Sequence, residues 1–323
     1  MIMRYDVVAL GELLIDLTEA GLSPNGMRLF EQNPGGAPAN MLTALSHSGY
    51  KTAFIGKVGD DMHGRFLIQT LEAEGIDTRA VIKDPDCFTT LAFVGLDENG
   101  ERSFSFARKP GADTMLRKEE LDQDLLSGCK IFHFGSLSMT DEPSRSATLE
   151  AVNIARSAGA LISYDPNYRP SLWSDQDAAI EQMSSVIGLV DMLKVSDEES
   201  ILLTGCKDLT AAADRLLSMG PRLIAVTLGQ KGVLIARSDF KQIIEGFNVN
   251  CVDSTGAGDC FWGGFLSCFL AYDKPVEAVS AEDLIQCALT GNAFAALCVE
   301  KRGGIPSIPS TEEVKQFVSC HSR

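Results

Sequence analysis

Apolar and polar residues alternate with different periods along the chain, and the changes of period predict strands alternating with helices. Short apolar runs that are typical of buried strands occupy residues 5–10, 52–58, 131–134, 161–164, 192–195 and 223–227. Stretches with helical spacing occupy residues 41–48, 66–74, 144–157, 175–187, 197–203 and 210–218. Such alternation predicts a mostly parallel sheet with helices on both faces.

Two segments in the first third of the chain have a different character. Residues 89–96 and 102–107 are predicted to be strands, because the turn signal Asp97-Glu98-Asn99-Gly100 lies between two strand-like runs. We expect residues 88–110, together with residues 12–34, to form a small β lid over the ends of the main strands.

The last third of the chain predicts two edge strands and then helices. Residues 233–236 and 242–245 fit an antiparallel pair, and two long helical stretches follow at 257–271 and 281–299. A short helix is expected from Thr311. The sequence has no internal repeat, low-complexity segment or evident linker, so we expect one large α/β domain over residues 1–323.

Composition narrows the range of partners. The chain has 44 acidic and 28 basic residues and a net charge of −16, which repels nucleic acid and anionic membranes, so we expect neither as a partner. The nine cysteines include no C-x-x-C pair and predict reduced thiols in a cytoplasmic protein. The first residues lack the basic region of a signal peptide, and no later apolar stretch is long enough to span a bilayer.

The most informative segment is Asp253-Ser254-Thr255-Gly256-Ala257-Gly258-Asp259, which we place after a strand end and at the start of a long helix. The main-chain N–H groups of Gly256, Ala257 and Gly258, with the helix N-terminus, would form an anion hole. A carboxylate directly after such a hole is costly unless it takes part in chemistry. Asp259 is therefore a candidate base for a hydroxyl that attacks a phosphoryl group. A glycine-rich turn with Asp259 in the dipole-favoured first turn is the open alternative.

A second glycine-rich segment, Asn33-Pro34-Gly35-Gly36-Ala37-Pro38-Ala39-Asn40, is expected to be a loop that leads into a helix. Gly35 and Gly36 let a ligand approach the backbone closely, and the amides of Asn33 and Asn40 suit sugar hydroxyls. A plain turn with an N-cap explains the same residues. The P-loop and protein-kinase signatures are absent, and four scattered histidines give no sign of a zinc site.

Five motifs together resemble those of one family. They are Gly35–Asn40, Lys57-Val58-Gly59-Asp60-Asp61, Asp165-Pro166-Asn167-Tyr168-Arg169, Val226–Gly232 and Asp253–Asp259. In this order, and nearly from end to end, the chain resembles the ribokinase, or PfkB-type, carbohydrate kinases. The resemblance implies a ribokinase-like α/β fold, ATP as the phosphoryl donor, magnesium, and direct transfer to a sugar hydroxyl.

The resemblance also implies roles for single residues. Asp259 matches the catalytic base of the family, and Gly256, Ala257 and Gly258 match its anion hole. Arg169 is expected to contact the substrate or to steady the phosphoryl group. The other positions expected to contact the sugar are Asp16, Asn33, Gly35, Gly36, Asn40 and Asn167.

Nucleotide and metal positions follow from the same resemblance. Residues that match the nucleotide site are Lys194, Thr227, Gly229, Gly232 and Asn292, with Gly256 and Gly258 of the anion hole. Glu199 matches an acid that is linked to magnesium through water, although Ser196 stands where the family often has asparagine. Asp253 and Thr255, with main-chain carbonyl groups near Val299–Gly304, fall where relatives hold a potassium ion, so we expect K⁺ as a further cofactor.

The segment from Phe104 to Asp113 resembles the fructokinase subgroup. It implies that Phe104 and Phe106 cover one face of the sugar, and that Arg108 contacts the substrate and lies with Asp113 near the lid. Packing of the lid alone is the open alternative for the two phenylalanines. Similar kinases for 2-keto-3-deoxygluconate would use Arg108 and Arg169 to hold a carboxylate. The pair Ala112-Asp113 and Asp16 favour neutral fructose, with fructose 6-phosphate and ADP as products.

Other functions stay open from the sequence. Another sugar or nucleoside kinase of the same fold is one alternative. A catalytically silent sugar-binding or interaction protein is another, but such a protein is expected to have lost Asp259 or a glycine of the anion hole. Apolar lid strands can pair between subunits, so a homodimer is expected.

Overall fold

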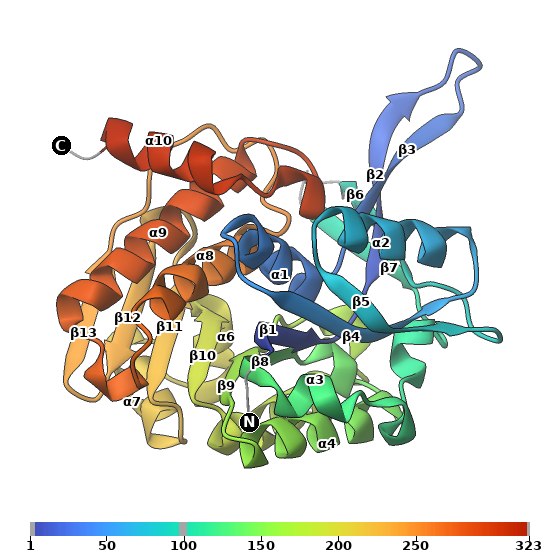
Figure 1. Ribbon diagram of the computed structural model, residues 1–323. Coiled ribbons are helices and arrows are strands. Elements are labelled where there is room, and N and C mark those ends of the chain that lie inside the picture. The colour runs from blue at the N-terminus through green and yellow to red at the C-terminus, as the bar shows by residue number, and fades with distance from the viewer. Residues whose placement is uncertain (1–3, 97–101, 322–323) are drawn as a thin grey trace.

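The computed structural model describes residues 4–96 and 102–321, without the side chains of residues 96 and 102–104 (Figure 1). Its main sheet has nine strands in the order β13-β12-β11-β10-β9-β8-β1-β4-β5. The strands from β5 to β11 pair in parallel, whereas β12 and β13 are antiparallel additions at one edge. Their bounds are β1 (Tyr5–Leu10), β4 (Thr52–Gly59), β5 (Asp77–Asp84), β8 (Cys129–Gly135), β9 (Leu161–Asp165), β10 (Met192–Ser196), β11 (Leu223–Thr227), β12 (Val233–Arg237) and β13 (Phe240–Ile244).

Helices cover both faces of this sheet, so successive residues of a strand enter different cores. In β1, Val8 and Leu10 belong to one buried cluster, and Val7 and Ala9 to the other. The first cluster is covered by α3 (Gln123–Ser127), α4 (Ser144–Ser157), α5 (Gln176–Ser185), α6 (Asp197–Thr204) and α7 (Leu209–Ser218). The second is covered by α1 (Ala37–His47), α2 (Met62–Ala73), α8 (Ala257–Ala271) and α9 (Ala281–Val299), and α10 (Thr311–His321) packs on α9 (Figure 1).

A second, four-stranded sheet has the order β3-β2-β6-β7. Its strands are β2 (Leu14–Leu22), β3 (Arg28–Gly35), β6 (Leu91–Leu96) and β7 (Arg102–Ala107), and the β2–β3 hairpin projects from the body of the molecule (Figure 1). The antiparallel pairing of β6 with β7 confirms the predicted strand pair, while its turn lies outside the described residues.

Most of the helices and strands predicted from the sequence are present in the structure, and some observed elements were not predicted. The predicted helices at 144–157, 257–271 and 281–299 have the observed bounds. The expectation that Asn33–Gly35 forms a loop was wrong: these residues end β3, because they pair with Leu14–Asp16 of β2. Strand β5 was not predicted, since its Asp and Lys residues hide the apolar pattern. The predicted strand end before Asp253 is also wrong, because β13 ends at Ile244 and an irregular segment follows.

Helices α1 and α8 approach each other through a glycine. A Cβ atom added to Gly263 of α8 would lie 2.6 Å from the carbonyl oxygen of Met41 and 2.7 Å from the Cβ atom of Ala44, both on α1. Only a residue without a side chain allows this distance between the two helices.

We predict that Gly263→Ala lowers the free energy of unfolding by about 1–3 kcal/mol, because the added methyl group must push the two helices apart. Thermal or denaturant unfolding measures the change. Gly188→Ala is the matched control, since its Cβ atom would meet nothing closer than 3.5 Å. Equal stability of the two variants would contradict the close packing of α1 on α8.

Candidate active site

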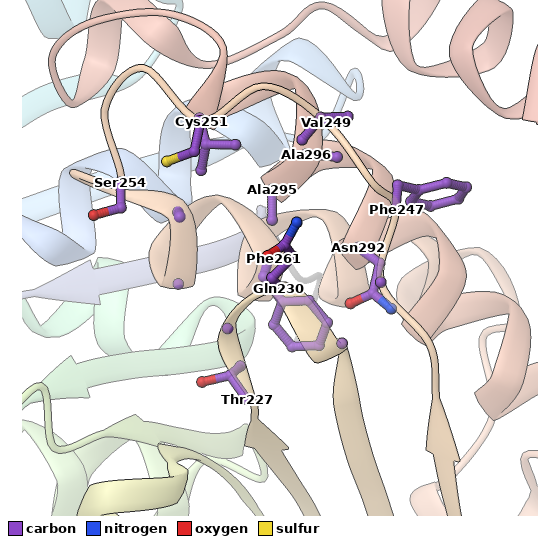
Figure 2. A pocket seen from close by; sticks show the side chains of 16 residues that line it. Thr227, Gln230, Phe247, Val249, Cys251, Ser254, Phe261, Asn292, Ala295 and Ala296 are labelled. Carbon is purple, nitrogen blue, oxygen red and sulfur yellow. The ribbon is translucent and has the colours of Figure 1, made fainter.

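A cavity of about 520 Å³ lies between the end of β11, the irregular segment after β13, and helices α8 and α9 (Figure 2). Its wall is mostly apolar and includes Phe247, Val249, Phe261 and Ala295. Of the residues predicted for the nucleotide site, it contains Thr227, Gly229, Gly232, Gly258 and Asn292. A mostly apolar space with a few polar groups in its wall suits a purine base and its ribose.

Asn292 has a defined position in this wall. Its Nδ2 donates hydrogen bonds to the carbonyl oxygens of Ile244 (3.3 Å) and Glu245 (3.0 Å). Because the amide nitrogen is used to hold the strand end, the side-chain oxygen is the group left to face a ligand.

A second cavity, of about 320 Å³, lies on the other side of the start of α8. Of the residues predicted for the sugar and for catalysis, its wall contains Asp16, Gly36, Asn40, Phe106, Asn167, Arg169, Gly256 and Asp259. These residues come from β2, α1, β7, the turn after β9 and α8, so residues far apart in sequence converge here. The chain thus brings carboxylates, amides and one guanidinium group around a space that suits a polyhydroxylated ligand.

The two cavities meet at the turn 254–259. Ser254 lines both; Ala257 and Gly258 line the larger one, and Gly256 and Asp259 the smaller one. Gly256 has a φ angle of 75°, which favours glycine, and no side chain caps the helix that follows. The N–H group of Ala257 donates to the carbonyl oxygen of Ser254 at 3.3 Å, a long bond that a ligand can replace. A helix start without a side-chain cap is compatible with the predicted anion hole.

Asp259 is buried in this turn, with 8% of the residue exposed. Asn40 donates a hydrogen bond from its Nδ2 to Oδ2 of Asp259, at 2.9 Å. Burial raises the pKa of Asp259 to about 6, although the charge of Lys194 and the hydrogen bond from Asn40 act to lower it. A carboxylate with such a pKa is ionised at neutral pH and is still basic enough to accept a proton.

Lys194 does not line the larger cavity, where it was expected. Its ammonium group is buried beneath the start of α8 and forms an ion pair with Asp165, at 2.7 Å. A Cβ atom on Gly258 would lie 2.8 Å from Nζ of Lys194, so this cation lies directly behind the anion hole. Burial acts to lower the pKa of Lys194, but the carboxylates of Asp165, Glu199 and Asp259 raise it above its usual value. The lysine thus adds positive potential where a transferred phosphoryl group would sit.

Glu199 has a structural role at the start of α6. Its two carboxylate oxygens accept hydrogen bonds from the main-chain N–H groups of Tyr168 (2.6 Å) and Ser196 (2.7 Å). Ser196 in turn accepts a bond from the N–H group of Glu199, which completes a capping box. Ser196 therefore replaces the expected asparagine without loss of the helix cap.

Asp253 and Thr255 lie beside the turn at Gly303. Asp253 accepts hydrogen bonds from the N–H groups of Thr255 (2.7 Å) and Gly303 (3.1 Å). Within residues 4–96 and 102–321, no three acidic, histidine or cysteine side chains form a cluster that could hold a metal ion. Side chains alone therefore do not make the predicted potassium site, and main-chain carbonyl groups would have to supply its other ligands.

Three residues expected to contact the sugar are absent from the wall of the smaller cavity. Arg108 is buried and donates to Asp113 (2.7 Å), Thr140 (2.8 Å) and the carbonyl oxygen of Leu137 (2.8 Å). The expectation that Arg108 contacts the sugar directly is therefore replaced by a structural role, in which Arg108 holds Leu137 in the cavity wall. Asn33 donates to the hydroxyl of Thr18. A Cβ atom on Gly35 would lie 2.6 Å from Oδ2 of Asp16, so this glycine makes room for that carboxylate. The side chain of Phe104 lies outside the described residues.

Glu12 also lines the smaller cavity, although the sequence analysis did not assign it a role. Its Oε1 accepts a hydrogen bond from the N–H group of Ala37 at 2.9 Å, and its Oε2 has no hydrogen-bond partner in the described part of the chain. Burial raises the pKa of Glu12 to about 7. Its place directly after the first buried strand, four residues before Asp16, was the available signal.

A family model described as pfkB family carbohydrate kinase matches residues 4–311. The chain belongs to this family. Fructokinase-2 of rice, Oryza sativa subsp. japonica, is 42% identical over 316 residues, which are 97% of this chain and 94% of the relative.

Solved structures agree with the sequence comparison. A fructokinase from Xylella fastidiosa with bound ATP has a TM-score of 0.91 and 33% identity, covering 98% of this chain and 99% of that one. A fructokinase from Vibrio cholerae O395, in a form with bound fructose, ADP and calcium ion, has a TM-score of 0.88 and 32% identity, covering 97% and 99%. The predicted family and the ribokinase-like α/β fold are confirmed.

The raised pKa of Asp259 has a consequence for stability. An acid with a pKa of 3.8 when unfolded and about 6 when folded makes the protein less stable as the pH rises from 4 to 6, because the unfolded chain loses the proton first. We predict that Asp259→Asn removes this loss and is more stable than the unmodified protein at pH 8, by up to roughly 3 kcal/mol.

Denaturant unfolding at pH 8 and at pH 5 measures this effect, and the gain should be smaller at pH 5. Asp177→Asn, an exposed position on α5, is the matched control. An Asp259→Asn variant no more stable than the unmodified protein at pH 8 would contradict the cost of the buried charge.

Proposed function

We propose that this carbohydrate kinase transfers the γ-phosphoryl group of ATP to the 6-hydroxyl of D-fructose and releases fructose 6-phosphate and ADP. The observation that carries the proposal is the shared turn 254–259, which borders the apolar cavity on one side and the polar cavity on the other. A donor in the first cavity and an acceptor in the second would react across this turn. The bound ATP of the Xylella fastidiosa fructokinase and the bound fructose of the Vibrio cholerae enzyme support the two assignments.

The residues of the turn then have distinct tasks. Asp259 accepts the proton of the sugar hydroxyl while the oxygen attacks the phosphoryl group in line. The N–H groups of Gly256, Ala257 and Gly258 hold the charge that spreads over the phosphoryl oxygens, with the ammonium group of Lys194 behind them. Arg169, in the wall of the sugar cavity, adds a second cation near the same point. Asp16 and Asn167, in the wall of the same cavity, hold the sugar hydroxyls.

Magnesium and potassium belong to this proposal as cofactors. Magnesium would neutralise charge on the phosphate groups, and Glu199 would hold it through a bound water. Potassium would be held beside Asp253 and Thr255, where the buried carboxylate of Asp253 would offset its charge. Related solved structures contain potassium, calcium or magnesium ions.

Fructose is favoured over 2-keto-3-deoxygluconate by the state of Arg108. A carboxylate substrate would need both Arg108 and Arg169, but Arg108 is paired with Asp113 and has a side chain that is 3% exposed. Opening this ion pair would leave a buried carboxylate without its partner, which is strongly unfavourable. A neutral sugar requires no such change.

The second sheet supports the lid part of the proposal. Residues 12–34 and 88–110 contribute Asp16 and Phe106 to the sugar cavity from this sheet, so its movement would close the site and exclude water. We treat the whole chain as one kinase domain with this lid. No described helix has the length and apolar character needed to cross a membrane. Nine free cysteines favour a cytoplasmic location, and the charge of −16 argues against nucleic acid as a partner.

We predict that Asp259→Asn lowers kcat for fructose by more than about 100-fold, since the asparagine cannot accept the proton. Dissociation constants for fructose and ATP should change by less than about threefold, because the side chain keeps its shape. Coupled ADP release and calorimetry measure the two quantities. Turnover near that of the unmodified protein would remove Asp259 from the role of base.

We also predict the order of substrates in a phosphorylation panel of fructose, 2-keto-3-deoxygluconate, ribose, glucose and adenosine. Fructose should have the highest kcat/KM, because Arg108 is already paired with Asp113 and the cavity wall presents several hydroxyl-binding side chains. A higher kcat/KM for another member would replace fructose as the substrate. ADP release that no member of the panel stimulates would favour a silent binding protein.

A homodimer formed through the second sheets of two copies is also part of the proposal. This sheet exposes Leu29 (45%), Phe30 (42%) and Phe93 (38%), and the two phenylalanine rings meet edge to face at 6.0 Å. Apolar side chains of this size gathered on one projecting sheet favour a partner of the same kind. Light scattering should give a dimer mass for the unmodified protein and a monomer mass for Phe30→Glu; identical masses would contradict the interface.

A further inference from the structure

The further inference concerns Asn40, a residue of α1 that contacts the proposed base from another part of the chain. The fold brings it within 2.9 Å of Asp259 across 219 positions of sequence. Both residues are buried, with 4% of Asn40 and 8% of Asp259 exposed. Water has little access to a hydrogen bond between two buried groups, so it does not compete with this bond. The bond therefore strongly influences the orientation and the charge state of the Asp259 carboxylate.

The orientation of the Asn40 amide follows from its neighbours. An ionised carboxylate only accepts hydrogen bonds, so the Nδ2 group must face Asp259. The opposite Oδ1 atom is buried and without a hydrogen-bond partner in the part of the chain that is described. It lies against the turn at Gly304, where an added Cβ atom would be 2.7 Å away. The amide is therefore locked between the turn at Gly304 and the base.

The helix that carries Asn40 is fixed from two sides. At its start, Glu12 accepts a hydrogen bond from the N–H group of Ala37, and a Cβ atom on Gly36 would lie 2.3 Å from the carbonyl oxygen of Glu12. Along its length, the contact of Met41 with Gly263 sets the distance to α8. Asn40 and Asp259 thus belong to two helices that cannot shift independently, and their distance is a property of the fold.

We propose that Asn40 is a positioning residue for the base: it holds Oδ2 of Asp259, so that the other carboxylate oxygen faces the sugar hydroxyl, and it favours the ionised form. This goes beyond contact with the sugar, and it rests on the proposed function of Asp259 as the base. Asn40 supplies a neutral donor, which orients the carboxylate without cancelling its charge as an arginine or lysine at this position would.

Other charged groups also act on the pKa of Asp259, so Asn40 accounts for only part of its value. Lys194 on β10 and Arg169 after β9 favour the charged form, whereas Asp165 at the end of β9 opposes it. The neighbouring thiol of Cys260 on α8 is buried, and burial raises its pKa far above the usual value, so it stays neutral. Loss of the Asn40 bond would remove a directional donor and leave the cations in place. The pKa of Asp259 should therefore rise, but the carboxylate should still ionise and accept a proton at higher pH.

The test compares kcat/KM for fructose from pH 5 to pH 9.5 in the unmodified protein, Asn40→Ala and Asn40→Asp. For Asn40→Ala we expect the acid limb of the profile to move up by about one pH unit or more. For Asn40→Asp we expect a larger upward shift, of at least about two units, because two carboxylates would then share one site. In both variants the loss at pH 7 should lie mainly in kcat and become smaller at high pH.

Asn153→Ala and Asn153→Asp, at an exposed position of α4, are matched controls and should keep the unmodified profile. An acid limb that stays in place in both Asn40 variants, or a loss confined to the KM for fructose, would overturn the proposal and leave Asn40 a sugar contact. If the unmodified protein does not phosphorylate fructose, the proposed function fails instead, and the profile is measured with whichever sugar of the panel reacts.

A second measurement does not depend on turnover. Unfolding of Asn40→Ala, Asp259→Asn and the double variant forms a double-mutant cycle at pH 8 and at pH 5. The proposal expects the two residues to be coupled at pH 8, where the base is ionised, and the coupling to weaken at pH 5. Equal coupling at the two pH values would overturn it, and this readout still decides the matter if Asn40→Asp does not fold.

Discussion

The arrangement of the site depends on one constraint, which is that a carboxylate must stay charged while it is almost completely buried. Asp259 meets this constraint in the first turn of α8, with a hydrogen bond from Asn40 and the charges of Lys194 and Arg169 nearby. Each partner offsets part of the lost hydration. Because none of them forms a close ion pair with it, the carboxylate keeps a pKa of about 6 and remains able to take a proton.

The glycines of the site serve the same constraint. Gly256 takes a left-handed conformation that opens α8 without a side-chain cap, and Gly258 leaves room for the lysine behind the anion hole. Gly35 leaves room for the carboxylate of Asp16, and Gly36 lets the start of α1 approach Glu12. These close approaches bring the backbone itself into the site, where its N–H groups are fixed dipoles that need no reorganisation during the reaction.

The two cavities differ in character because they are built from different parts of the fold. The nucleotide side is enclosed by α8, α9 and the strand ends near β11, which are elements of the rigid apolar core. The sugar side takes Asp16 and Phe106 from the second sheet, which has exposed apolar side chains and whose β2–β3 hairpin projects from the body. A rigid donor site and an acceptor site completed by a projecting sheet suit a reaction in which water must be excluded after the sugar binds.

The sequence by itself determined the elements and the chemical groups. The strand bounds of Leu223–Thr227, the helix bounds of Ala257–Ala271 and the place of the proposed base Asp259 at the start of that helix follow from local signals. Hydrophobic period and glycine pattern are properties of neighbouring residues. The five ordered motifs also determined the family. Each of these signals spans a few residues, so it can be recognised without knowing how the rest of the chain folds.

Only the tertiary structure decided which of these groups meet. It placed Lys194 behind the start of α8 and not in the larger cavity, and it paired Arg108 with Asp113. It used one oxygen of Glu199 for the cap of α6 and the other for the N–H group of Tyr168. It also brought Glu12 into the sugar cavity and Asn40 onto the base. Pairings across 29 or 219 positions depend on sheet order and helix packing, which no short stretch of sequence encodes.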